Sequence, residues 1–467
     1  MMADAFALSE RIGHPVLFRP TTRVCHSYAS VELTDDSGQW TVGRAPAFVK
    51  ENGRWVIFPR LAYLNHLQIE DSLDKLSMEI PEGAGNRLLG EGTKGIAAGG
   101  VSWQYLMETF AVRAAAPSRP SEQPPAKLLK LATYPLSEPL ILQFLKGLDE
   151  VLVCEELDPV IEDELLRICG KHHLNIAIHG KRTGDIPRAG ELSVPIIGEA
   201  VSRFLGAENN YQLSTVNCQV PARAPVLCAG CPHRASFFAV KEAMKGKAAS
   251  FSGDIGCYTL GNAPPLDMVD TCLCMGAGIT QAQGLGLAEP GPLRFAFVGD
   301  CTLFHTGLPG IVNAVYNRHD VIVCVLDNAT TAMTGGQPHP GMPSTLLGEP
   351  AKAVNAFEVV KAMGVDFIER VNAFDLVACK EVVHRAAAQP GVRVIFFEGY
   401  CINLMKKGEP CVITENCTNC GLCIRKLGCP ALSQGESSAT IEETLCTGCT
   451  LCAKVCPFNA IEGGVSI

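Results

Sequence analysis

Two apolar runs in the second half of the chain each end in polar residues. RFAFVGD covers residues 294–300, and VIVCVLDN covers residues 321–328. Continuous apolar runs of this length, alternating with helical segments, predict buried parallel strands that are joined by helices. Ligands of such sheets bind beyond the carboxyl ends of the strands, so these two polar ends mark a candidate site. We assign residues 211–405 to this α/β domain.

A second alternating pattern, from residue 96 to residue 182, predicts a smaller α/β domain at residues 91–210. Its expected helices and strands are GIAAGGV, a helix through Trp103, KLLKLAT, SEPLILQFLKGL, VLVCEEL, PVIEDELLRIC and LNIAIHG. The proline-rich segment APSRPSEQPPAK, residues 116–127, is expected to be a linker within this domain. In residues 1–90 the pattern predicts one helix, the strand PVLFRP and the loop TTRVCH.

Composition narrows the class of protein. With 467 residues, 47% of them apolar, the chain is long enough for several domains. The formal net charge of -9 and the scattered Lys and Arg residues give no basic stripe, so we expect no nucleic-acid partner. There is no run of eighteen apolar residues, and the first residues lack a basic start and an apolar stretch. We therefore expect a cytoplasmic protein without a membrane partner.

Cysteine usage points to metal chemistry. The chain contains 22 cysteines, and they are densest between residues 401 and 456. Disulfides are rare in a reducing cytoplasm, so such clustering favours metal ligation over a disulfide scaffold.

The tail repeats a spacing that is typical of bacterial ferredoxins. One copy reads Cys446-x-x-Cys449-x-x-Cys452-x-x-x-Cys456-Pro457, and the other reads Cys417-x-x-Cys420-x-x-Cys423-x5-Cys429-Pro430. In two-cluster ferredoxins the fourth cysteine of each run binds the other cluster. The expected ligand sets are Cys417, Cys420, Cys423 with Cys456, and Cys446, Cys449, Cys452 with Cys429. Residues 406–467 thus resemble a 2[4Fe-4S] ferredoxin module of α+β fold. The alternative is a pair of structural zinc knuckles, which normally use two separated cysteine pairs.

The polar strand ends resemble the motif that binds thiamine diphosphate. In that motif a Gly-Asp-Gly turn and a downstream Asn hold magnesium against the diphosphate, as hard oxygen ligands do. Gly299, Asp300 and Asn328 occupy these places, and Cys301 stands where glycine is usual. The resemblance makes Asp300, Asn328 and the carbonyl of Thr330 the magnesium ligands.

Two glycine-rich segments fit the same picture. SGDIGCYTLG covers residues 252–261, and MGAGITQAQG, residues 275–284, opens a predicted helix whose N–H groups would approach a diphosphate. Taken singly, each also fits ordinary helix packing through small residues. The cofactor-binding positions that the resemblance implies are Gly256, Cys257, Gly276, Gly278, Gly299, Asp300, Asn328, Thr330, Met333 and Thr334.

With CAGCPHR, GDCTLFHTG and DNATTAMTGGQPHPG in order along the chain, the sequence resembles the large (alpha) subunits of indolepyruvate:ferredoxin oxidoreductases. The resemblance implies thiamine diphosphate, Mg²⁺ and [4Fe-4S] clusters as cofactors, with coenzyme A as cosubstrate. It implies oxidative decarboxylation of an arylpyruvate to acyl-CoA and CO₂, with electrons passing through the clusters to ferredoxin. A small beta subunit is the implied partner.

A third [4Fe-4S] cluster follows from the same resemblance. In relatives, a cluster beside thiamine is held by a Cys-x-x-Cys pair, a cysteine of the next Gly-Cys loop and a distant fourth. Cys228, Cys231, Cys257 and Cys401 occupy these places, although all four also fit buried thiols. His233 and His305 are expected in loops facing the cofactor, as proton relays or as hydrogen-bonded structural residues.

The front of the chain carries a further expectation. Residues 91–210 resemble a transketolase C-terminal domain, which would support the assembly. Residues 1–90 resemble the end of a pyrimidine-binding domain. Arg23 would there meet a substrate carboxylate or simply be solvated. Since most of the pyrimidine-binding domain is missing, the start is truncated or split, or another polypeptide supplies that half. The rival functions are a non-catalytic electron-transfer or assembly subunit and a thiamine decarboxylase that releases free aldehyde.

Overall fold

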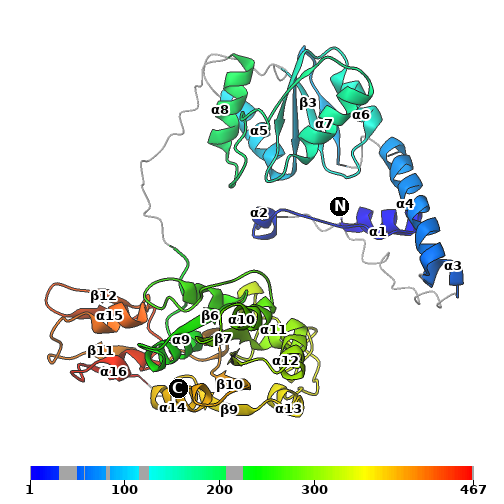
Figure 1. Ribbon diagram of the computed structural model, residues 1–467. Coiled ribbons are helices and arrows are strands. Elements are labelled where there is room, and N and C mark those ends of the chain that lie inside the picture. The colour runs from blue at the N-terminus through cyan, green and yellow to red at the C-terminus, as the bar shows by residue number, and fades with distance from the viewer. Residues whose placement is uncertain are drawn as a thin grey trace. The chain divides into compact units, whose positions relative to one another are not determined.

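The computed structural model describes residues 2–30, 50–56, 58–79, 85–114, 126–206 and 224–464. The chain divides into two compact units, Met1–Gln219 and Val220–Ile467 (Figure 1). The division lies near the boundary expected between residues 210 and 211. The other expected domain boundaries stay predictions.

The first unit is built on a five-stranded sheet in the order β1-β3-β2-β4-β5, in which only β1 is antiparallel. Apolar side chains cover both faces: Phe144 and Ile168 lie in the core on one side, Trp103 and Ile197 in the core on the other. The alternating pattern therefore predicted this sheet correctly. Its strands and helices are β1 (Arg87–Leu89), β2 (Lys94–Gly99), α5 (Gly100–Ala114), β3 (Lys127–Leu131), α6 (Glu138–Leu145), β4 (Glu150–Cys154), α7 (Val160–Lys171), β5 (Ala177–His179) and α8 (Val194–Leu205).

The beginning of the chain differs from its prediction. The segment PVLFRP forms no strand, because prolines stand at both its ends and its Leu17 is 92% exposed, without a sheet beside it. The expected loop TTRVCH contains a short helix, and Arg23 within it is exposed and pairs with Glu191. Residues 116–125 of the expected linker lie outside the described residues. The helices here are α1 (Met2–Ile12), α2 (Thr22–Cys25), α3 (Asn52–Trp55) and α4 (Pro59–Glu79).

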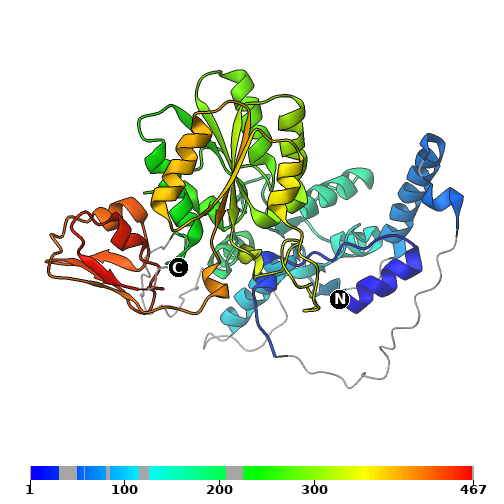
Figure 2. The same cartoon turned by 90° about the horizontal axis from the view of Figure 1, so that it is seen from below.

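The second unit contains a parallel sheet in the order β6-β7-β8-β10-β9 with helices on both faces (Figures 1 and 2). Phe237 of α9 packs in the core on one face, and Ile279 of α10 packs in the core on the other. The strands are β6 (Ala249–Ser252), β7 (Leu293–Gly299), β8 (Val321–Asp327), β9 (Phe367–Asn372) and β10 (Val392–Glu398). The helices are α9 (Pro232–Ala243), η1 (Cys257–Asn262), α10 (Ala277–Ala288), α11 (Asp300–Thr302), η2 (Leu303–Gly307), α12 (Leu308–Tyr316), η3 (Ala332–Thr334), α13 (Ala356–Ala362), α14 (Leu376–Ala387) and η4 (Ile402–Leu404).

The tail of the second unit is a small α+β module. Strand β11 (Cys411–Ile413) pairs antiparallel with β14 (Ile461–Gly463), and β12 (Leu432–Gln434) pairs with β13 (Ala439–Ile441). Each cysteine run leads into a short helix, α15 (Leu422–Leu427) or α16 (Leu451–Val455). Lys454 Nζ donates to the carbonyl of Phe374 at 2.9 Å, which ties this module to the rest of its unit. None of the described helices combines the length and apolar character that a membrane crossing requires.

Candidate functional site

The buried carboxylate of Asp300 is the centre of the site at the sheet edge. Strands β7 and β8 are parallel neighbours, so Asp300 and Asn328 follow the same edge of the sheet. The Asp300 carboxylate accepts hydrogen bonds from the N–H of Cys301 at 2.7 Å and from the N–H of Asn328 at 3.1 Å. His339 Nε2 lies 3.1 Å from the second carboxylate oxygen. These contacts hold the Asp300 carboxylate next to Asn328, as the sequence motif predicted.

A second acidic group, Asp327, stands beside Asp300. Burial and the neighbouring Asp300 carboxylate raise the pKa of Asp327 well above its usual range. A divalent cation between such groups favours their charged forms, and carboxylate, amide and carbonyl oxygens suit Mg²⁺. Within the described ranges, no three His, Cys, Asp or Glu side chains group closely enough for one metal ion. The expected magnesium ligands do not depend on such a group, because they include the amide of Asn328 and the carbonyl of Thr330.

The glycine-rich turns are held together by Asp254. This fully buried carboxylate accepts from the N–H of Gly276 at 2.7 Å and from the hydroxyl of Tyr258 at 3.1 Å. Gly276 has φ of 85°, and a Cβ there would lie 2.2 Å from Thr306 Oγ1. Helix α10 begins directly after it without a side-chain cap. The N–H of Ala277 donates to the carbonyl of Cys274 at 3.1 Å, so an anion would meet the N–H groups that follow in this first turn.

Three further glycines allow close approach of neighbouring groups. A Cβ on Gly278 would lie 2.4 Å from the carbonyl oxygen of Gly253. Cβ atoms on Gly256 and Gly299 would lie 2.4 and 2.5 Å from the ring of Tyr258. The ring of Tyr258 thus packs against both turns, and the cradle has no room for larger residues.

The two histidines lie in helical segments, so their prediction as loop residues is wrong. Pro232 starts α9 immediately after Cys231, which places His233 in the first helical turn. His233 is buried against Tyr258, with ring centroids 5.6 Å apart, and burial lowers its pKa to about 4. His233 is therefore neutral at pH 7. His305 is exposed on the turn Leu303–Gly307, where the chain runs on from α11 into α12.

The loop after β8 holds the remaining expected cofactor contacts. Thr330 is buried, and its carbonyl accepts from the N–H of Ala332 at 3.0 Å, which leaves one lone pair of that oxygen. Met333 and Thr334 lie exposed on η3. The structure therefore places Thr330 within the buried site and the other two at its surface.

The four cysteines of the expected third cluster gather near the same edge. Burial raises the pKa of Cys257, and Cys228 and Cys401 lie close enough to add to that shift. Burial also raises the pKa of Cys231 to about 12, with a smaller effect from Cys228. The N–H of Cys401 donates to the carbonyl of Asn328 at 3.0 Å. Segments far apart in the sequence thus meet beside the Asp300 site.

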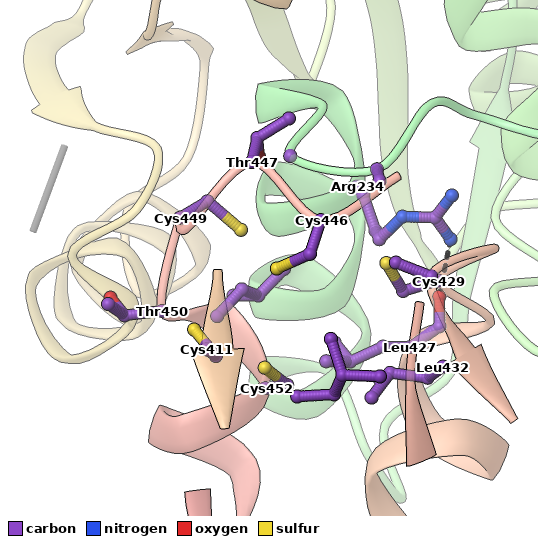
Figure 3. A pocket seen from close by; sticks show the side chains of 15 residues that line it. Arg234, Cys411, Leu427, Cys429, Leu432, Cys446, Thr447, Cys449, Thr450 and Cys452 are labelled. Atoms are coloured by element: carbon purple, nitrogen blue, oxygen red, sulfur yellow. Dashed lines mark hydrogen bonds between the residues drawn. The ribbon is translucent and has the colours of Figure 1, made fainter. Parts of the chain in front are cut away.

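Each expected set of tail cysteines lines one cavity. Cys417, Cys420, Cys423 and Cys456 line one of them. Cys429, Cys446, Cys449 and Cys452 line the other, where their thiols surround a common space (Figure 3). Gly428, with φ of 58°, ends α15 and turns the chain so that Cys429 reaches this cavity despite its longer spacing. Thiolates suit a cubane cluster, whose four sulfur ligands each bind a separate iron.

Cys411 is a fifth thiol in the second of these cavities, and the sequence did not indicate it. It is the first residue of β11 and is 2% exposed. The neighbouring Cys452 lowers the pKa of Cys411, and Figure 3 shows both thiols facing the same space. Cys411 stands outside both Cys-x-x-Cys runs, so no spacing rule identified it. Four further residues of the site were not predicted from the sequence, although they lie in segments whose apolar runs or turns indicated the site. They are Asp254, Tyr258, Asp327 and His339.

Comparison with known proteins agrees with this geometry. The family described as thiamine pyrophosphate enzyme, C-terminal TPP binding domain, matches residues 254–397, and the 4Fe-4S binding domain matches residues 439–462. Indolepyruvate oxidoreductase subunit IorA of Methanothermobacter thermautotrophicus is 37% identical over 99% of this chain and 74% of its own length. The IorA of Thermococcus kodakarensis is also 37% identical, over 99% of this chain and 75% of its own. The chain belongs to the IorA family.

The IorA assignment covers both units of the chain, whereas the two domain matches lie in the second unit. This IorA family member is an oxidoreductase subunit with thiamine pyrophosphate and iron–sulfur as cofactors. A solved 2-oxoglutarate:ferredoxin oxidoreductase from Magnetococcus marinus matches 40% of this chain and 67% of its own at 20% identity. The TM-score of this match is 0.34.

Proposed function

We propose that this chain is the cofactor-bearing subunit of an enzyme that decarboxylates arylpyruvates, indolepyruvate in particular, oxidatively to acyl-CoA and CO₂. Ferredoxin accepts the electrons, coenzyme A accepts the acyl group, and a small beta subunit is a partner of the chain. The observation that carries this proposal is the meeting of Asp300 and Asn328 at one sheet edge within the matched thiamine domain. The names of the IorA relatives support the choice of substrate.

In this proposal the residues around Asp300 bind the metal and the diphosphate. Asp300, Asn328 and the Thr330 carbonyl hold Mg²⁺, and Asp327 adds negative charge next to them. The turns at Gly256, Gly276, Gly278 and Gly299 accept the diphosphate against backbone N–H groups. When bound, thiamine diphosphate supplies the carbanion chemistry that a 2-oxoacid decarboxylation needs.

The histidines take different roles because their surroundings differ. His233 is buried and neutral, so it can exchange a proton with bound substrate without first losing one to solvent. His305 is exposed and suits proton exchange with solvent.

The cysteines carry the electrons away from the sheet edge. The cavity with Cys417, Cys420, Cys423 and Cys456 holds one [4Fe-4S] cluster, and the cavity with Cys429, Cys446, Cys449 and Cys452 holds the other. Cys228, Cys231, Cys257 and Cys401 hold a third beside Asn328. All three sets belong to the same compact unit as the metal site.

The test uses the full chain, purified without oxygen and combined with its small beta subunit. Indolepyruvate, thiamine diphosphate, Mg²⁺ and coenzyme A should produce an EPR signal of reduced clusters and release acyl-CoA. Asp300→Asn should abolish this substrate-driven signal, while dithionite still reduces its clusters. Free aldehyde with no reduced-cluster signal would favour the simple decarboxylase. If calorimetry detects no thiamine diphosphate binding with or without the beta subunit, the chain is a non-catalytic electron carrier.

A further inference from the structure

Arg234 is a buried cation that pairs with no acidic side chain among the described residues. It lies in the first turn of α9 and is 3% exposed. Its guanidinium donates to the carbonyl oxygens of Leu427 at 2.5 Å and Gly428 at 2.8 Å, and to that of Leu227. All of these acceptors are neutral, and its Nε atom is buried without a hydrogen-bond partner among the described residues.

Burying a charge without a counter-charge is strongly unfavourable, so a partner of opposite charge is expected near Arg234. The groups around it that favour its positive charge are cysteines, Cys429 first, followed by Cys231, Cys228 and Cys449. Arg234 also lines the cavity of the second tail set, where Figure 3 shows it beside Cys429. These thiols become negative only as thiolates, which is the form that binds iron.

The other tail cavity has no buried cation among its described lining residues, because Arg425, whose guanidinium lies near Gly421 at the edge of this cavity, is exposed. The side chains that line it, among the residues that the structure describes, are apolar, hydroxyl or thiol groups, and none of them is basic. The two tail sites thus differ in the buried charge beside them, and also in the fifth thiol, Cys411, which only the cavity near Arg234 contains.

We propose that Arg234 is the counter-charge of the cluster held by Cys429, Cys446, Cys449 and Cys452, and that it raises the reduction potential of this cluster above that of the other tail cluster. The proposal rests on the clusters assigned under the proposed function. Reduction adds one electron to the cluster, and a buried positive charge stabilises that electron because charges interact strongly in a medium of low dielectric constant. Arg234 thus sets the potential and is not itself a ligand.

The first test removes the charge and keeps a side chain that can still donate N–H hydrogen bonds. In Arg234→Gln, the midpoint potential of one tail cluster should become more negative by at least about 59 mV. For a one-electron couple, this shift corresponds to a tenfold change in the ratio of reduced to oxidised cluster. Arg234→Lys should keep the potential near that of the parent. The readout is an EPR-monitored redox titration of the full chain, with iron content measured in parallel.

Arg393→Gln is the matched control. Arg393 is 1% exposed, its Nε has no hydrogen-bond partner among the described residues, and it also donates to carbonyl oxygens. It differs from Arg234 in that it pairs with Asp320 and lines neither cavity. It should leave both potentials unchanged. An Arg234→Gln protein with intact clusters and unchanged potentials would overturn the inference, and so would equal shifts of both tail clusters.

A second measurement does not need any Arg234 variant to fold. In the unmodified chain the two tail clusters should titrate at different potentials, and Cys449→Ser should remove the signal of higher potential. If Cys420→Ser removes that signal instead, the inference is wrong even though the clusters exist. Absence of clusters from the parent protein would contradict the proposed function itself, so the two failures are distinguishable.

Discussion

The backbone N–H of Cys401 donates a 3.0 Å hydrogen bond to the carbonyl oxygen of Asn328. This bond joins the loop after β10 to the loop after β8, two neighbouring parallel strands. It places an expected cluster ligand beside an expected magnesium ligand. Because the bond uses only main-chain atoms, the Asn328 side chain remains available for the metal.

The first prediction separates these two roles of Asn328. Asn328→Ala should weaken Mg²⁺-dependent thiamine diphosphate binding at least tenfold, because a metal ligand is lost, while iron content stays at the parent level. Calorimetry and iron analysis give the two readouts. Asn317→Ala is the control, because Asn317 is exposed at the end of α12 and bonds only Asn313 among the described side chains. If both variants bind thiamine diphosphate with equal affinity, Asn328 is not a ligand of the metal.

The second prediction concerns the start of α10. Gly276→Ala should destabilise the protein by about 2–4 kcal/mol, because a Cβ is strained at φ of 85° and meets Thr306 at 2.2 Å. It should also reduce thiamine diphosphate affinity. Gly284→Ala lies in the same helix with nothing within 4 Å of the added Cβ, and should be neutral or slightly stabilising. Chemical denaturation compares the two, and similar losses would contradict the predicted crowding at Gly276.

The third prediction distinguishes the two cysteines that compete for one cluster. Cys411 and Cys429 both line the cavity with Cys446, Cys449 and Cys452. Cys429→Ser should lose the iron and acid-labile sulfide of one cluster, whereas Cys411→Ser should retain them. The opposite result would make Cys411 the fourth ligand and Cys429 the neighbouring thiol.

The fourth prediction tests the contact between the CAGC loop and the tail. A Cβ on Gly230 would lie 2.0 Å from Thr447 Oγ1. The free energy of unfolding of Gly230→Ala should therefore be at least about 1 kcal/mol lower than that of Gly246→Ala. Gly246 is the matched site, because its φ of 77° is close to the 76° of Gly230. A Cβ added at Gly246 would have no atom within 4 Å. Thr447→Gly should rescue Gly230→Ala if the contact causes the difference.

The fifth prediction is a pH dependence in the first unit. Hydrogen bonds from Lys171 and His172 lower the pKa of Glu138. A carboxyl with a lowered folded pKa contributes stability above its unfolded pKa, and this contribution is lost as the pH falls through the folded value. Glu138→Gln should therefore lower the free energy of unfolding by about 1 kcal/mol at pH 7 and by nothing at strongly acidic pH. Glu199→Gln, which breaks an exposed pair with Arg203, should change little at either pH.

Much of the site could be read from the sequence because its signals are local. Strands β7 and β8 are buried because residues 295–298 and 321–326 are all apolar, and polar residues follow directly. The tail sets depend on short spacings within one loop, so the paired cysteines were predictable before any fold was known. PVLFRP failed as a strand because a strand needs a neighbour, and the residues alone do not supply one.

Only the tertiary structure decided the contacts between residues that are distant in the sequence. Cys411 joins the cavity because β11 pairs with β14 at the far end of the tail, and Arg234 reaches it because α9 packs against α15. His339 meets Asp300 only through the loop that returns over the sheet edge. Spacing predicted the two tail sets of cysteines, and the apolar pattern predicted strands of both sheets. Packing decided which charges and thiols surround them, because burial and Coulomb interaction depend on distance in space and not on separation along the chain.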